Sequence, residues 1–229
     1  MNARLQMGDG QCGLTFMKFT LTYDGPLKSN GRPGHKWAIR KKLSPQLNEL
    51  WRVSPAMQHV ASVRWYPLTP GFHASEIHHS SNDPGNAGGP APPSPMGSWI
   101  DILEPIQIKG HTFIPLIRDS LALHCGLKII YLRKEEPGRL IYQSGDLDNR
   151  LKTLFDALSV PDNDQVQDDD EAPNPMHCLL ENDRLISGIN VETGRLLDDK
   201  ADKADVRLII EVDVRVSLAK TYNHAFLGG

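Results

Sequence analysis

The clearest periodic pattern in the chain is an alternation of apolar and polar residues near its C-terminal end. In DVRLIIEVDVRVS, residues 205 to 217, every second residue is aliphatic, so these side chains share one face of an extended chain. FMKFTLTYDG, residues 16 to 25, alternates in the same way, and CGLKIIYLRKE, residues 125 to 135, is rich in aliphatic residues. These three segments are predicted to be strands, the first and second of them with one apolar face.

Two segments have helical spacing. Within residues 147 to 158 the apolar side chains fall on one helical stripe, made of Leu147, Leu151, Leu154, Phe155 and Leu158. In KKLSPQLNELWRV, Ser44 is a suitable N-cap and Pro45 suits the first helical position, so we expect a second helix that ends at about Val53. The basic stretch before it, PLKSNGRPGHKW, is rich in glycine and proline and is expected to form a turn.

The remaining segments suggest one domain with insertions. Residues 111 to 122 predict a strand and a short helical turn, and residues 179 to 194 predict one extended strand. Residues 66 to 97 hold seven prolines and five glycines without periodicity, which indicates an insertion loop. We expect flexible tails at 1 to 15 and 221 to 229, around a single domain at 16 to 220.

Composition bounds the class of protein. The chain has 229 residues, 39% of them hydrophobic, and no apolar run approaches the roughly 20 residues of a membrane span. Three widely separated cysteines argue against a disulfide framework and against a cysteine zinc site. Together with an N-terminus that lacks the apolar stretch of a signal peptide, they lead us to expect a cytoplasmic protein.

Charge is unevenly distributed. Residues 1 to 143 carry 16 basic and 10 acidic residues, a net +6, whereas residues 144 to 229 carry 9 and 18, a net −9. A basic half that faces phosphates and an acidic half that binds cations would give this pattern, and so would chance partition of solvated charges.

The candidate chemistry lies at the start of the predicted helix, in GDLDNRLKTLFDALS. Asp146 and Asp148 are one residue apart where an extended segment is expected to meet the helix, so both carboxylates can converge on one point. Two nearby carboxylates repel unless a cation compensates them, and Mg²⁺ prefers carboxylate oxygens. Lys152 can neutralise charge on a phosphate, and Asp183 is our candidate for a third acid. The alternative is that Asp148 caps the helix and Asp146 is exposed.

A second candidate is a basic cluster around His35. The cluster could follow a DNA backbone through phosphate contacts, or form basic surface without a partner, and its members are Arg32, Lys36, Arg40, Lys41 and Lys42. Trp37 within the cluster is either a core residue or a side chain that stacks on a splayed base, and we favour the core.

Two further motifs predict less. The acidic segment DNDQVQDDDE lacks the glycine and glutamate of a calcium loop, so we expect a solvated, mobile loop, or a segment that mimics the charge of DNA. The pair His78 and His79 lacks further zinc ligands at suitable spacing and is expected to be exposed and polar.

The string DLDNRLKTLFDAL, followed by ENDRLI at a strand start, resembles the RusA-type Holliday junction resolvases, a family of crossover junction endodeoxyribonucleases. The proline-bearing turn PLKSN after the first strand and the closing strand DVRLIIEVDV also resemble that family. The resemblance extends from about 16 to 217 with two long insertions, at about 54 to 98 and 159 to 178. Asp183 takes the place of the family's third essential aspartate, and Asn182 stands where its acidic neighbour usually is.

The resemblance implies a small α+β domain with helices packed on a mixed β-sheet. It implies a homodimer that binds four-way DNA junctions and cuts them with Mg²⁺ or Mn²⁺ in DNA recombination and repair. Asp146, Asp148 and Asp183 would bind the metal, Lys152 would assist the transition state, and the DNA would contact Lys28, Asn30, Arg32, Lys36, Arg40 and Lys41.

Two other functions stay open from the sequence. The long insertion between the metal acids could displace Asp183 and leave a branched-DNA-binding protein without cleavage. Alternatively, the acidic half could be a protein-interaction surface with no role in nucleic-acid binding.

Overall fold

The computed structural model describes residues 17–67, 99–134, 144–200, 202 and 204–227, without the side chains of Pro67 and of residues 144–146. The strands are β1 (Lys18–Pro26), β2 (Trp65–Pro67), β3 (Trp99–Asp101), β4 (Ile106–Ile108), β5 (His111–Ile117), β6 (Leu123–Arg133), β7 (Met176–Leu180), β8 (Ile186–Arg195) and β9 (Asp205–Val216). The α-helices are α1 (Pro33–Val53), α2 (Pro55–Ser62) and α4 (Ser144–Leu158), and the short 3-10 turns are η3 (Asp119–Leu121), η4 (Asp183–Leu185) and η5 (Thr221–Phe226).

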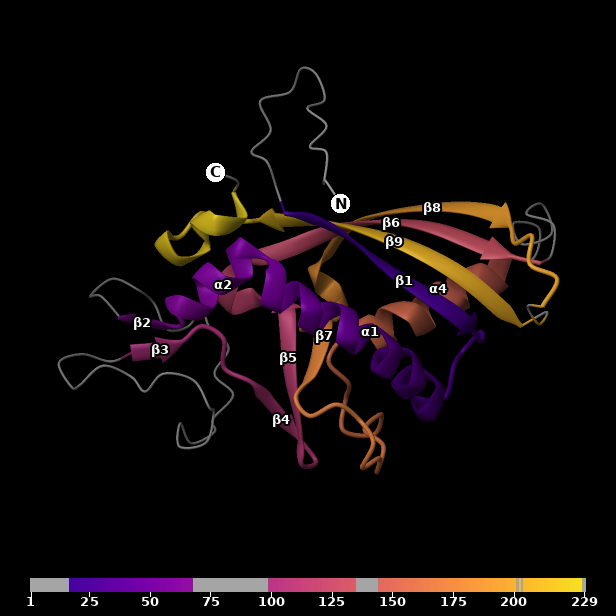
Figure 1. Cartoon of the computed structure of the whole chain (residues 1–229), viewed down its shortest axis with the longest axis horizontal. Coiled ribbons are helices and arrows are strands. Elements are labelled where there is room, and N and C mark those ends of the chain that lie inside the picture. The colour runs from indigo at the N-terminus through magenta and orange to yellow at the C-terminus, as the bar shows by residue number, and fades with distance from the viewer. Residues whose placement is uncertain (1–16, 68–98, 135–143, 201, 203, 228–229) are drawn as a thin grey trace, which may run out of the picture.

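A mixed four-stranded sheet in the order β1-β9-β6-β8 forms the main layer. β9 pairs antiparallel with both β1 and β6, whereas β6 and β8 run parallel. The alternation of β9 gives the expected result, because its even-numbered residues from Val206 to Val214 are buried. Figure 1 shows α1 and α4 on one side of this sheet, and the core joins the sheet to both helices. The expectation of an α+β fold with helices on a mixed sheet is therefore confirmed.

A second sheet in the order β4-β5-β7 lies beside α1 and has a smaller core of its own. Its buried residues are Trp37, Phe113, Val166, Met176 and Cys178. Trp37 comes from α1 and Val166 from the segment before β7, so this core fixes the second sheet to α1.

Helix α1 begins at Pro33, twelve residues before the predicted first helical position at Pro45. Pro33 stands in its first turn, where a missing N–H is not needed, and Pro45 lies inside the helix. Ser44 is not an N-cap: its buried hydroxyl accepts a hydrogen bond from the His177 backbone N–H at 2.9 Å. The predicted turn from 26 to 37 is therefore wrong beyond residue 32.

The segment predicted as one strand from 179 to 194 is broken at 181–185. β7 belongs to the second sheet and β8 to the first, so the chain changes sheets at η4. Asn182 caps this turn, because its side chain accepts from the Arg184 backbone N–H at 3.2 Å. The break matters because Asp183 is the first residue of the turn.

The ends of the predicted domain also differ from expectation. Residues 55 to 67, within the predicted first insertion, form α2 and β2, and Met57 and Val60 of α2 are buried in the main core. Residues 221–226, expected as a tail, form η5, whose Tyr222 packs edge-on against Tyr66 with ring centroids 4.8 Å apart. Residues 68–98, which include His78 and His79, lie outside the described residues.

Candidate functional site

Asp148 and Lys152 lie on the same face of α4. They are four residues apart in a helix, so their side chains are neighbours along its axis, and both are exposed. A different face of α4 is apolar: Leu151, Leu154 and Leu158 are buried in the core beneath the four-stranded sheet. Burial of this stripe therefore turns the acid and the lysine toward solvent.

Asp183 is exposed at the start of η4, and η4 packs against α4. The chain arrives there because Ser159, just after α4, forms a parallel bridge with Leu180 at the end of β7, and Val160 N–H donates to Leu180 O at 2.9 Å. The segment that carries the third predicted acid is thus beside the helix that carries Asp148, although the predicted insertion at about 159 to 178 separates them in the sequence.

The backbone at Asp146 and Asp148 differs from the expectation. Both residues lie within α4, whose first residue is Ser144, rather than where an extended segment meets the helix. Residues two apart on a helix do not share a face, so alternation along a strand cannot bring these two carboxylates together. The side chain of Asp146 is outside the described part of the structure.

Metal ligation by the three acids stays a prediction. Among the described side chains, no group of three or more His, Cys, Asp or Glu residues is arranged to hold a metal ion. Asp148 and Asp183 are nevertheless exposed carboxylates on contacting elements, and carboxylate oxygens are the donors that Mg²⁺ prefers. The donor chemistry of the two described acids therefore fits a hard divalent cation.

The turn that precedes α1 is fixed to α4. Gly31 N–H donates to the Thr153 hydroxyl at 2.9 Å, and the Arg150 guanidinium donates to the Leu27 carbonyl. Gly31 has no room for a side chain, because a Cβ would lie 2.6 Å from the Thr153 methyl and 2.8 Å from His35. These contacts hold residues 27 to 31 against the helix of Asp148 and Lys152.

His35 supports the same turn from α1. Its Nε2 accepts a hydrogen bond from the Lys28 backbone N–H at 3.1 Å. Burial lowers the pKa of the His35 imidazole, and the nearby Lys28 charge lowers it further, so the ring is neutral at pH 7 and can accept. His35 is thus a structural residue within the basic cluster.

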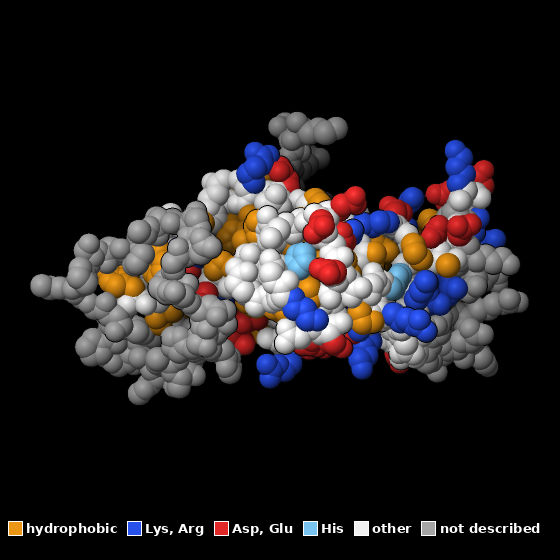
Figure 2. All heavy atoms as spheres, turned by 90° about the horizontal axis from the view of Figure 1, so that it is seen from below, with side chains coloured by type: hydrophobic (Ala, Val, Ile, Leu, Met, Phe, Trp, Pro, Cys, Tyr) orange, Lys and Arg blue, Asp and Glu red, His pale blue; other side chains and the backbone are white. Residues whose placement is uncertain are grey.

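The predicted DNA-binding residues separate by exposure. Lys28, Asn30 and Arg32 are exposed in and just after the turn held on α4. Lys36 is mostly buried and its Nζ lies 2.6 Å from the Asp156 carboxylate, so it links α1 to α4. On the face seen in Figure 2, basic and acidic side chains are interspersed rather than gathered in one basic patch.

Arg40 is a correction to the predicted DNA-binding set. Its side chain is 1% exposed, and it donates to two backbone carbonyls at the end of α4, those of Ser159 at 3.0 Å and Asp156 at 2.6 Å. A buried guanidinium that satisfies a helix C-terminus is not available to a phosphate. Arg40 therefore serves the α1–α4 interface.

The acidic segment, residues 162–171, also differs from the solvated loop that we expected. Val166 is buried in the second core, and the Asp169 carboxylate accepts from Trp37 Nε1 at 3.0 Å and pairs with Lys41 Nζ at 2.7 Å. Trp37 is 2% exposed, which confirms it as a core residue. The segment is therefore packed against α1, and Lys41 has an acidic partner.

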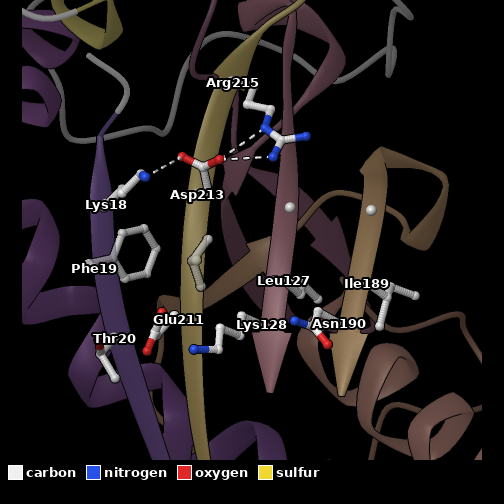
Figure 3. A pocket seen from close by; sticks show the side chains of 13 residues that line it. Lys18, Phe19, Thr20, Leu127, Lys128, Ile189, Asn190, Glu211, Asp213 and Arg215 are labelled. Atoms are coloured by element: carbon white, nitrogen blue, oxygen red, sulfur yellow. Dashed lines mark hydrogen bonds and ion pairs between the residues drawn. The ribbon is translucent and has the colours of Figure 1, made fainter. Parts of the chain in front are cut away.

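A groove of about 500 Å³ crosses the other face of the four-stranded sheet (Figure 3). Gly188 leaves space in its floor, whereas the Arg215 guanidinium, paired with Asp213 at 2.9 Å, lies over Gly126. None of the predicted site residues lines this groove. It is on the sheet face opposite α4, so it is separate from the candidate site.

Sequence reasoning missed the residues that join the turn to the site, namely Gly31, Arg150 and Thr153. Arg150 and Thr153 lie within the helix motif itself, at positions outside its apolar stripe and outside the line of Asp148 and Lys152. The positions of Arg150 and Thr153 were the available signal for this contact, because polar residues on a further face of a helix need either solvent or a hydrogen-bond partner.

Comparisons with known proteins leave the chain without an assigned family. No protein-family model matches it, and neither a curated protein nor a solved structure shows significant similarity. Within the described residues, no helix is both long and apolar enough to cross a membrane.

Proposed function

We propose that this protein is a Mg²⁺-dependent, structure-selective endodeoxyribonuclease that cuts four-way DNA junctions. The observation that carries the proposal is the packing of η4 against α4, which brings the element of Asp183 beside the helix of Asp148 and Lys152. The sequence resemblance to RusA-type resolvases supports the same assignment of these residues.

Each part of the site then has a role in phosphodiester hydrolysis. Asp146, Asp148 and Asp183 would hold the cation, which supplies stabilisation of negative charge on the attacked phosphate. Lys152, on the same face of α4 as Asp148, would donate to a phosphate oxygen as charge develops there. Lys28, Asn30 and Arg32, exposed next to α4, would contact the phosphates of a junction arm.

A catalytically inactive DNA-binding protein is the second candidate. It is favoured by the helical backbone at Asp146 and Asp148, which does not place alternate residues on one face. In that function the turn at 28–32 binds branched DNA without cleavage.

A cleavage assay on a synthetic four-way junction separates these functions. With Mg²⁺, the wild type is expected to cut the junction, and Asp148→Asn should cut it at a rate at least about 100-fold lower. The control variant Asp170→Asn, at an exposed position, should cut at the rate of the wild type. Tight junction binding without cutting by any of the three supports the inactive protein. Absence of junction binding at moderate salt contradicts both and leaves the protein-interaction surface.

A further inference from the structure

The acidic segment runs along a single stripe of α1. Gly34, Trp37 and Lys41 are three and four residues apart, so they lie in line on the helix. The Gln167 side chain lies above Gly34, at 3.5 Å from the position of a Cβ there, and Asp169 reaches both Trp37 and Lys41. The contact therefore covers two turns of the helix that we expected to face DNA.

Asp169 is fully engaged in this contact. One carboxylate oxygen binds Lys41 and Trp37, and the other accepts from the Glu171 backbone N–H at 3.2 Å. The hydrogen bonds from Lys41 and Trp37 lower the pKa of the Asp169 carboxyl, so it is charged at any pH near neutrality. Lys41, at 32% side-chain exposure, is thus neutralised although it remains reachable from solvent.

The neighbours of Asp169 add to the negative charge over this helix. The segment contains six acidic residues in ten positions, and all except Asp169 are exposed. A phosphate backbone that approached Lys41 would have to displace Asp169 and accept repulsion from the neighbouring carboxylates. Because Val166 is buried in the second core, the segment is held close to α1 even if the ion pair opens.

We propose that the acidic segment is a built-in anionic cover that withholds Lys41 and the adjoining face of α1 from phosphate backbones. Sequence-independent affinity for linear duplex is thereby reduced, and binding depends on the exposed basic residues Lys28, Arg32 and Lys152 beside the candidate site. This regulatory role in DNA binding rests on the proposed function.

Matched charge variants test the cover. Asp169→Asn removes one negative charge and the partner of Lys41, whereas Asp168→Asn removes one negative charge from an exposed neighbour for which the described structure records no hydrogen bond or ion pair. Asp169→Glu keeps the charge, and Lys41→Ala in the Asp169→Asn background removes the freed cation. Each variant is applied to a heparin column, and its binding to a four-way junction and a linear duplex is measured between 50 and 200 mM salt.

A freed Lys41 is expected to act as one additional phosphate contact. The Asp169→Asn protein should elute from heparin at higher salt than the Asp168→Asn protein. The slope of log binding constant against log salt concentration should become more negative by about 0.9 for DNA binding by Asp169→Asn. Its gain in affinity should therefore shrink about threefold between 50 and 200 mM salt. Asp169→Glu, which keeps the charge, and the double variant with Lys41→Ala, which restores the net charge, should both return to the behaviour of the wild type.

The two proposals fail in different ways. Equal elution of Asp169→Asn and Asp168→Asn from heparin, with unchanged thermal unfolding of both, overturns the cover. A shift on heparin together with no DNA binding by any variant supports masking of Lys41 and overturns the proposed nuclease. If the Asp169→Asn protein unfolds at a much lower temperature, elution of Lys41→Ala and the wild type from heparin is compared instead. Elution at the same salt concentration supports the cover, because Lys41 is then already masked in the wild type. Elution of Lys41→Ala at lower salt overturns the cover.

Discussion

At the scale of single residues, exposure separates the basic side chains of α1 and the turn before it into two groups. Lys28 and Arg32 are exposed, whereas Lys36 and Arg40 are used inside the protein, as links to Asp156 and to the end of α4. Sequence position alone could not distinguish these groups, because all four are basic residues within thirteen positions. The distinction depends on which side of α1 packs against α4.

Arg40→Ala is expected to destabilise the fold. It removes two charge-assisted hydrogen bonds and leaves two carbonyls at the end of α4 without their donor, so the free energy of unfolding should fall by roughly 3 kcal/mol. Denaturant unfolding measures this loss. Arg32→Ala, at an exposed position, should change stability by less than about 0.5 kcal/mol. Similar small effects of both substitutions would contradict the buried role of Arg40.

At the scale of elements, the close approach of the turn at 27–31 to α4 positions the exposed residues of the candidate site. The approach requires glycine at position 31, because its backbone N–H meets the Thr153 hydroxyl and its Cα has no free space around it. A Cβ at Gly34, three residues later, would meet the Gln167 side chain at an ordinary contact distance of 3.5 Å. The two glycines therefore offer a matched comparison of the same substitution.

Gly31→Ala is expected to force the turn away from α4. The added methyl group would sit at 2.6 Å and 2.8 Å from side-chain atoms of Thr153 and His35, and relief of such overlap typically costs about 1–3 kcal/mol. Gly34→Ala should be neutral or slightly stabilising, since alanine favours a helix over glycine. Thermal unfolding of both variants tests this, and a Gly31→Ala protein as stable as Gly34→Ala would refute the close contact.

Several elements could be predicted from periodicity, and the misses have physical causes. β6, β9 and α4 each carry an apolar face of five or more residues, and β1 carries the shorter alternation of Phe19, Leu21 and Tyr23, which the local pattern reveals. The first turns of α1 contain proline and glycine, which have weak helix propensity. The helix forms there nevertheless, because burial of Trp37 and Ile39 in the core outweighs that propensity. The break at η4 arises because the chain leaves one sheet after β7 and enters the other at β8. No local sequence pattern encodes this change of sheet.

At the scale of the whole molecule, part of the charge asymmetry is resolved internally. Two acids of the C-terminal half, Asp156 and Asp169, pair with bases of the N-terminal half. Their partners, Lys36 and Lys41 respectively, both lie on α1. The simple division into a phosphate-binding half and a cation-binding half therefore does not hold for these residues. The acids that remain exposed on α4 and η4, Asp148 and Asp183, are the ones that the nuclease proposal assigns to metal binding.

Direct measurement of divalent-ion binding tests the central claim that acids distant in the sequence share one cation site. In calorimetric titrations with Mn²⁺, the wild type is expected to bind, and Asp148→Asn and Asp183→Asn should each weaken binding by about tenfold or more, which is ~1.4 kcal/mol. The control variant Asp170→Asn, at an exposed position in the acidic segment, should bind Mn²⁺ with the affinity of the wild type. Unchanged Mn²⁺ affinity in Asp183→Asn would contradict the shared site and the nuclease proposal built on it.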